Sequence, residues 1–93
     1  MNKKLFINEI SSDLFKVKIV DKSETFHLVT LSDNYLNKLT ENKISKKKLI
    51  ELSFKFLLEK EENTSILSEF DLQVISQYFP DYLDNVKSWC LSN

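Results

Sequence analysis

The 93-residue sequence contains no glycine, no alanine and no arginine. Phosphate-cradling loops and dinucleotide-binding turns depend on glycine, because their backbone adopts positive φ angles and approaches the phosphate closely. The absence of glycine therefore excludes those nucleotide-binding motifs. Without arginine the chain also lacks the planar fork that grips a phosphate or a guanine base through two hydrogen bonds, so such contacts would fall to lysine.

Histidine, cysteine and proline each occur once, as His27, Cys90 and Pro80. One cysteine cannot form an internal disulfide, which is typical of a protein in a reducing compartment. No His/Cys cluster has the spacing of a zinc site, and no acidic run has the glycine-bearing pattern of a calcium loop. We therefore expect no metal, no cofactor and no catalytic residue, and we interpret the protein as not an enzyme.

Long hydrophobic runs are also missing, and none approaches the length of a membrane span. The N-terminal segment MNKKLFINEI is basic but lacks the apolar block and the cleavage site of a signal peptide. These observations predict a cytoplasmic protein without membrane contact. With 42% hydrophobic residues, the chain suits a single small globular domain over residues 1–93.

The strongest secondary-structure pattern lies in residues 45–62, SKKKLIELSFKFLLEKEE. Its polar residues recur at three- and four-residue spacing along one narrow side, which predicts a helix covered by protein on every other side. Ser45 is a suitable N-cap for this helix. The polar side consists of Lys48, Glu51, Lys55, Glu59 and Glu62.

Two runs before this helix have the alternation of half-buried strands, over residues 14–20 and 25–31. A turn centred between Lys22 and Ser23 would place Ile19 opposite Phe26 and would leave His27 on the solvent side. Residues 4–10 could be either a third, edge strand or a loosely ordered start.

Further helices are predicted over residues 33–40, 66–78 and 81–91, with Ser32 as the cap of the first and Pro80 separating the last two. The sequence thus predicts an α+β fold. An N-terminal antiparallel β-hairpin, or a three-stranded sheet, packs on three to four helices centred on residues 46–60.

The stretch SFKFLLEKEENTSILSEFDLQVISQYFPDY, residues 53–82, covers about a third of the chain. It resembles a family of short bacterial proteins with the pattern SFxFLLE…SIL…FDLxVIxxYFPxY, to which no activity is attached. The resemblance implies a small bacterial cytosolic protein and supplies no catalytic residues. Most positions of the pattern are also explained by packing, with Phe54, Phe56 and Phe70 among the core candidates.

His27 and Cys90 are the candidates for a catalytic role. His27 would need an acidic partner for proton transfer, and the predicted register places none beside it. Cys90 lies at core spacing beside Trp89, where a buried, inert thiol is the simpler interpretation than a nucleophile. We interpret both as structural.

A basic patch over residues 43–48, formed by Lys43, Lys46, Lys47 and Lys48, is not explained by packing. Three of these lysines occupy the first turn of the central helix, where the helix dipole disfavours positive charge. We therefore predict Lys46, Lys47 and Lys48 as partner-binding residues, while a solvated charge run remains the simpler alternative. The patch and the strand residues Lys16 and Lys18 could contact nucleic acid.

Aromatic residues gather near Pro80, and a domain this small need not bury all of them. We predict Tyr78 and Tyr82 at a partner surface. The charge is also uneven: residues 1–48 hold 10 Lys and 6 acidic residues, whereas residues 49–93 hold 3 Lys and 8 acidic residues. Such halves can dock on each other or attract a second molecule.

These features favour a non-catalytic protein–protein interaction or regulatory module that binds a protein partner or self-associates, as a homodimer for example. The alternative is a nucleic-acid-associated regulator that uses the patch over residues 43–48. DNA binding through a helix over residues 66–78 is disfavoured, because that segment carries Glu69 and Asp71 and no lysine.

Overall fold

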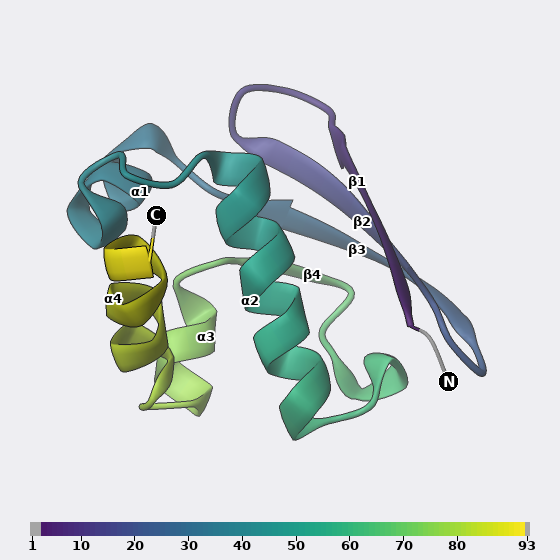
Figure 1. Ribbon diagram of the computed structural model, residues 1–93. Helices are drawn as coiled ribbons and strands as arrows, with labels where there is room; N and C mark the ends of the chain where they lie inside the picture. Colours follow the sequence, from purple (N-terminus) through teal and green to yellow (C-terminus); the bar gives the residue numbers. More distant parts are fainter. Residues whose placement is uncertain (1–2, 93) are drawn as a thin grey trace.

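The N-terminal third of the chain forms an antiparallel meander. In the computed structural model, which describes residues 3–92, its strands are β1 (Lys4–Glu9), β2 (Leu14–Val20) and β3 (Glu24–Thr30). The predicted hairpin is confirmed. Residues 4–10, for which the sequence allowed either an edge strand or a loosely ordered start, contain the third strand, β1. Figure 1 shows this sheet beside a group of helices, so the predicted α+β class is also confirmed.

The register of β2 and β3 differs by one residue from the prediction. The connection is a three-residue turn, Asp21 to Ser23, so Val20 pairs with Glu24 and Val17 pairs with His27. Since side chains alternate across a sheet, this shift exchanges the two faces of β3. His27 is therefore buried at 2% exposure, and Phe26, predicted to face the core, is 48% exposed.

The helices begin where the sequence places capping residues. Helix α1 (Asp33–Thr40) begins after Ser32, and α2 (Lys46–Lys60) begins after Ser45. Each serine hydroxyl accepts a hydrogen bond from the backbone N–H three residues later, at 3.1 Å. After α1 the chain turns through positive φ at Glu41 (55°) and Asn42 (61°), a conformation that glycine adopts most easily and that non-glycine residues must adopt in this glycine-free chain.

The predicted helix over residues 66–78 is wrong. This part of the chain forms a 3₁₀ turn η1 (Asn63–Ser65), a short strand β4 (Glu69–Asp71) and a short helix α3 (Val74–Tyr78). Strand β4 pairs in parallel with β3, which completes a four-stranded sheet of order β1-β2-β3-β4. Helix α4 (Tyr82–Ser92) follows Pro80, close to its predicted bounds.

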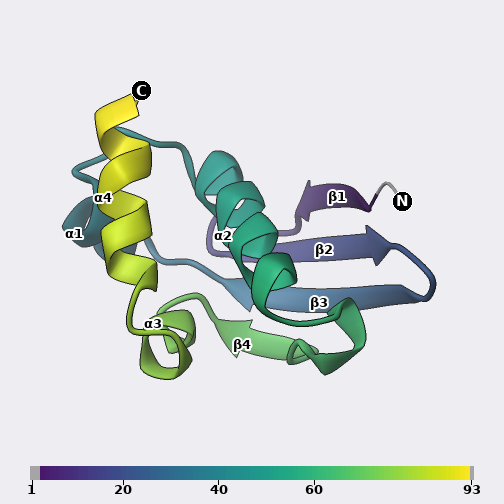
Figure 2. The ribbon, with the colours of Figure 1, turned by 60° about the horizontal axis from the view of Figure 1, so that its bottom comes forward.

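The core lies between one face of the sheet and α2, which crosses that face (Figure 2). Helices α1, α3 and α4 gather at one end of the sheet in both views. The middle of α2 is buried as predicted, with Phe54 at 0% and Phe56 at 4% exposure. Within residues 3–92 no helix covers the opposite face of the sheet, which carries Phe6 and Phe26.

Candidate functional site

The two edges of the sheet differ in how far they are protected against another strand. Strand β4 has only three residues, two of which are the acidic Glu69 and Asp71. Short length and charge are common devices against edge-to-edge pairing. Strand β1 has six residues, KLFINE, with apolar side chains in its middle and charges at its ends. It is therefore the more accessible edge.

The hydrogen-bonding direction along β1 follows from the turn beside it. The N–H of Ile10 donates to the carbonyl oxygen of Leu14 at 2.8 Å, which makes these two residues a hydrogen-bonded pair. Such pairs alternate along antiparallel strands, so Lys4, Phe6 and Asn8 direct their backbone groups toward β2. The backbone N–H and C=O groups of Leu5 and Ile7 consequently face the open edge.

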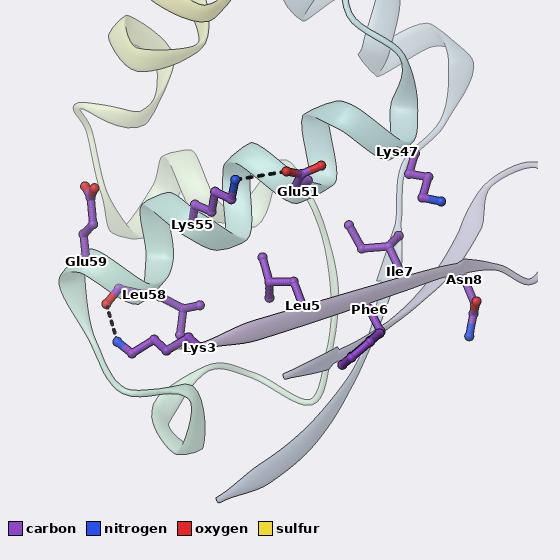
Figure 3. A pocket seen from close by; sticks show the side chains of 10 residues that line it. All are labelled: Lys3, Leu5, Phe6, Ile7, Asn8, Lys47, Glu51, Lys55, Leu58 and Glu59. Carbon is purple, nitrogen blue, oxygen red and sulfur yellow. Dashed lines mark hydrogen bonds and ion pairs between the residues drawn. The ribbon is translucent and has the colours of Figure 1, made fainter. Parts of the chain in front are cut away.

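An open groove of about 660 Å³ lies between β1 and α2. Figure 3 shows Leu5 and Ile7 pointing from β1 toward α2, while Phe6 and Asn8 point away. Leu5 and Ile7 pack against the core and are only partly buried. The α2 side of the groove consists of Lys47, Glu51, Lys55, Leu58 and Glu59.

Charged side chains alternate along the α2 side of the groove. Lys55 Nζ lies 3.0 Å from a Glu51 carboxylate oxygen, and this hydrogen bond holds the pKa of Glu51 below its ordinary value. At the other end Lys3 Nζ donates to the carbonyl oxygen of Leu58 at 3.4 Å. The groove thus combines an apolar floor, an open backbone edge and a wall with both charge signs, which suits an extended peptide segment.

The uncovered face of the sheet carries a second feature. Phe6 and Phe26 are 49% and 48% exposed, on β1 and β3. The β2 lysines lie over these rings, with Lys18 Nζ 5.6 Å from the Phe6 centroid and Lys16 Nζ 4.9 Å from that of Phe26. Lys18 also pairs with Glu24 at 3.1 Å. Flat rings beside positive charge can stack on bases or contact an apolar protein surface.

The three lysines predicted as a binding patch have different environments. Lys46 Nζ contacts Asp33 at 2.7 Å, Asp13 at 3.1 Å and the carbonyl oxygen of Ser12 at 2.6 Å. Burial opposes its charge, yet the two carboxylates raise the pKa of Lys46 above its ordinary value. The charge of Lys46 thus joins α2 to α1 and to the turn after β1, and a role for Lys46 in partner binding stays a prediction.

Lys47 and Lys48 are exposed, and as consecutive residues of a helix they point in directions about 100° apart. Lys48 Nζ lies 3.8 Å from Glu51, whereas Lys47 lines the groove beside β1. Lys43 is also exposed and pairs with Glu41 at 3.5 Å. The predicted basic patch is thus reduced to separate lysines with acidic neighbours.

The two predicted interface tyrosines also separate. Tyr78 is 67% exposed and lies at the rim of a smaller hollow of about 230 Å³, beside Leu67 and Phe79. Tyr82 has no exposed surface, and its hydroxyl lies 2.6 Å from Ser53 Oγ. The expectation of Tyr82 at the surface is wrong, since it packs on the rings of Phe56 and Trp89.

The buried His27 belongs to a polar chain within the protein. Its Nδ1 donates to the carbonyl oxygen of Leu67 at 2.7 Å, since a carbonyl oxygen only accepts. Its Nε2 lies 2.9 Å from Thr25 Oγ1, which in turn accepts a hydrogen bond from Asn63 Nδ2 at 3.0 Å. These hydrogen bonds join η1 and the segment before β4 to β3. No acidic side chain takes part in them.

Cys90 is half-buried, and its Sγ lies 3.9 Å from the carbonyl oxygen of Thr40.

Across residues 3–92, no three His, Cys, Asp or Glu side chains are grouped so that they could hold a metal ion. In the same part of the chain, no helix has both the length and the apolar character needed to cross a membrane.

Comparison with known proteins yields no match to a protein-family model, a curated protein or a solved structure. The interpretation of the site therefore depends on the geometry of β1 and its groove. Sequence reasoning identified β1 only as one of two alternatives and did not single out Leu5, Phe6 or Ile7 as binding residues. The short apolar run Leu5 to Ile7 between the charged ends Lys4 and Glu9 was the signal that could have identified an edge strand.

Proposed function

We propose that this protein is a non-catalytic protein-binding module that accepts an extended segment along β1. The carrying observation is that β1 leaves the backbone groups of Leu5 and Ile7 open beside an apolar-floored groove. A sheet edge of this kind binds another strand through main-chain hydrogen bonds, while side-chain pockets select the sequence. The single cysteine supports a cytoplasmic location for this activity.

The groove explains how such a segment would be recognised. Every second side chain of an added strand would point toward α2, where Leu5, Ile7 and Leu58 offer apolar surface. The intervening side chains would lie on the uncovered face, beside Phe6. Lys47 and Glu59 mark the two ends of the groove, so a segment with charges of opposite sign at its ends would be favoured.

The proposal can be tested with isotope-labelled protein in a native extract of its source cells. We expect partner binding to slow hydrogen exchange at the outward-facing amides of Leu5 and Ile7. The amides of Phe6 and Asn8 already bond to β2 and are expected to remain protected throughout. Substitution Ile7→Pro should abolish the added protection, because proline removes an outward N–H without removing a bond to β2.

Ile7→Val is the matched control, since it keeps both the amide and the apolar side chain. It should retain the protection seen in the wild-type protein. Unchanged exchange at Leu5 and Ile7 in every extract and at every protein concentration would contradict a binding role for β1.

A second candidate function, single-stranded nucleic-acid binding, is favoured by the row formed by Phe6, Lys18 and Phe26. Phe6 pairs with Lys18, and Lys18 pairs with Phe26 across three neighbouring strands. Bases could stack on the two rings while the lysines contact phosphates. The net charge of −1 and the acidic residues of β4 act against this function, so it ranks second.

This candidate predicts salt-sensitive binding of a single-stranded oligonucleotide, measured by fluorescence anisotropy at low ionic strength. Phe26→Ala should weaken binding about 5- to 150-fold, the equivalent of about 1–3 kcal/mol for one stacked base. Lys22→Gln, in the exposed turn between β2 and β3, is the control and should have little effect. Binding that is absent, or insensitive to Phe26→Ala, would rule out this use of the sheet.

A further inference from the structure

We propose that the segment accepted by β1 is β1 of a second copy of this chain. The two strands would pair antiparallel about a two-fold axis, with Phe6 opposite the partner's Phe6, to form an eight-stranded sheet. This inference rests on the proposed protein-binding function and names its partner. It follows from symmetry, hydrogen-bonding direction and side-chain chemistry, which limit the register in succession.

Symmetry sets the first limit. Two strands side by side and antiparallel are related by a two-fold axis perpendicular to the sheet, so each face of one copy continues into the same face of the other. Directly opposed residues share a face. Leu5 and Ile7 face α2, whereas Phe6 and Asn8 face away. Odd-numbered residues must therefore oppose odd-numbered ones.

Hydrogen bonding sets the second limit and agrees with the first. The outward backbone groups belong to Leu5 and Ile7, and by the same alternation to Glu9; a continuation of β1 by one residue in the dimer would add those of Lys3. A hydrogen-bonded pair across the new seam must consist of two such residues. Registers that pair odd-numbered with odd-numbered residues satisfy this condition. The direction of the backbone groups therefore selects the same registers as the requirement that opposed side chains share a face of the sheet.

Side-chain chemistry selects one register from that set. With Phe6 on the axis, Leu5 opposes the partner's Ile7, and Lys3 opposes the partner's Glu9. Apolar groups then meet apolar groups, and a positive charge meets a negative charge twice, once on each side of the axis. On the outer face Lys4 opposes the partner's Asn8. No like charges are opposed in this arrangement.

The neighbouring registers are less complementary. With Ile7 on the axis, Leu5 would oppose the carboxylate of the partner's Glu9. With Leu5 on the axis, Lys3 would oppose the partner's Ile7 and Glu9 would lose its counterpart. The Phe6 register also gives the longest overlap, from Lys3 to Glu9 on each copy. The composition of β1 is thus self-complementary about its centre.

The first test is the molar mass of the full chain by light scattering from micromolar to millimolar concentration. We expect the mass to rise toward twice the monomer value, and Ile7→Pro to remain monomeric at all concentrations. Ile7→Val should dimerise like the wild type. Circular dichroism should show that both variants are folded. A wild-type protein that remains monomeric at millimolar concentration would overturn the proposal.

The second test uses charge reversal and does not depend on the proline variant. In a dimer of Lys3→Glu alone, a carboxylate at position 3 would face the carboxylate of the partner's Glu9 on both sides of the axis. In a dimer of Glu9→Lys alone, two lysines would face each other on both sides of the axis. Each should weaken the dimer roughly tenfold to a hundredfold. An equimolar mixture of the two variants should restore the dimer, because in the mixed dimer both pairs are of opposite sign. A mixture no more dimeric than its components would refute the register.

Failure of this inference can be told apart from failure of the proposed function. A monomeric protein whose Leu5 and Ile7 amides gain protection in cell extract would bind a different chain at β1. In that outcome the second copy is refuted and the binding function is retained. A dimer whose Leu5 and Ile7 amides exchange as fast as in the monomer would pair elsewhere and would overturn the β1 seam.

Discussion

Tyr82 shows at the scale of one residue how burial and hydrogen bonding are linked. It is the largest fully buried side chain in the described part of the protein, and its hydroxyl is paired with Ser53 Oγ at 2.6 Å. Burial raises the pKa of Tyr82 well above its ordinary value, because the charged phenolate would lose its hydration. A buried hydroxyl of this kind must keep its partner.

We predict that Tyr82→Phe lowers the free energy of unfolding by about 1–3 kcal/mol, because Ser53 Oγ is left buried without its partner. Urea denaturation measures this change. Adding Ser53→Ala to Tyr82→Phe should recover part of the loss, since both polar groups are then removed. Tyr78→Phe is the control and should have little effect, because Tyr78 is 67% exposed. An equal loss at both tyrosines would contradict the paired hydroxyl.

His27 illustrates a residue whose position could not be read from its neighbours in the sequence. Its neighbour Phe26 is more hydrophobic than His27 and was predicted to face the core. Instead, the three-residue turn places His27, Val29 and Leu31 inward. The imidazole is accommodated because both its nitrogens have hydrogen-bonding partners, at Leu67 and Thr25. Thr25 lies on β3 itself, whereas Leu67 belongs to the segment before β4, 40 residues along the chain, which local periodicity does not reveal.

At the scale of an element, α2 shows how a helix can tolerate three lysines in its first turn. The dipole disfavours positive charge there, and α2 has no acidic residue in its first turn. Lys46 offsets this cost through Asp33 and Asp13, which belong to α1 and to the turn after β1. Its side chain is 13% exposed, so the charge is partly shielded from solvent. Lys47 and Lys48 remain at the surface.

We therefore predict different effects for two neighbouring lysines of α2. Lys46→Gln should lower the free energy of unfolding by about 1 kcal/mol, since both carboxylates it contacts are largely exposed and the ion pairs are screened. Lys47→Gln should change it by less than about 0.5 kcal/mol. Thermal unfolding at neutral pH compares the two. A larger loss at Lys47 would contradict the assignment of the stabilising ion pairs to Lys46.

The segment after α2 shows the opposite case, in which an element was mispredicted. Residues 66–78 have apolar positions compatible with a helix, but only Val74–Tyr78 is helical. Backbone hydrogen bonds from Leu28 to Ser68 and from Leu72 to Thr30 draw the first part into the sheet as β4. Pairing with β3 satisfies these groups and buries Phe70. A parallel partner distant in sequence leaves no local signal.

On the scale of the whole molecule, the sheet is covered on one face and unevenly protected at its edges. The radius of gyration is 12.5 Å, close to about 12 Å expected for a compact chain of this length. Helix α2 crosses one face, β4 ends the sheet with charge, and β1 remains open beside the groove. The accessible surfaces are thus the β1 edge and the outer face with Phe6 and Phe26.

Self-pairing at β1 also links stability to concentration. If the folded state dimerises and the unfolded state does not, mass action stabilises the fold as the concentration rises. The unfolding midpoint of the wild type should therefore increase with concentration, whereas that of Ile7→Pro should not. If the unfolding midpoints of the wild type and of Ile7→Pro rose equally with concentration, the association would not involve β1.

Much of the architecture was accessible from the sequence because it depends on local interactions. Ser32 and Ser45 mark helix starts through hydrogen bonds within one turn, and Pro80 limits the helix before it. The β2–β3 hairpin and the burial of Phe54 and Phe56 follow from side-chain period. The candidate site was not accessible in the same way, because Leu5 and Ile7 become a groove floor only when α2 lies beside them.

The sequence by itself determined the α+β class, the central helix and the absence of glycine-dependent phosphate loops. Only the tertiary structure decided that His27 is buried, that Lys46 is engaged internally, that Tyr82 is enclosed and that β1 is an open edge. The physical reason is the range of the interactions involved. Helix caps and periodicity act within a few residues, whereas strand register, ion pairing and edge exposure depend on segments that meet only in the folded chain.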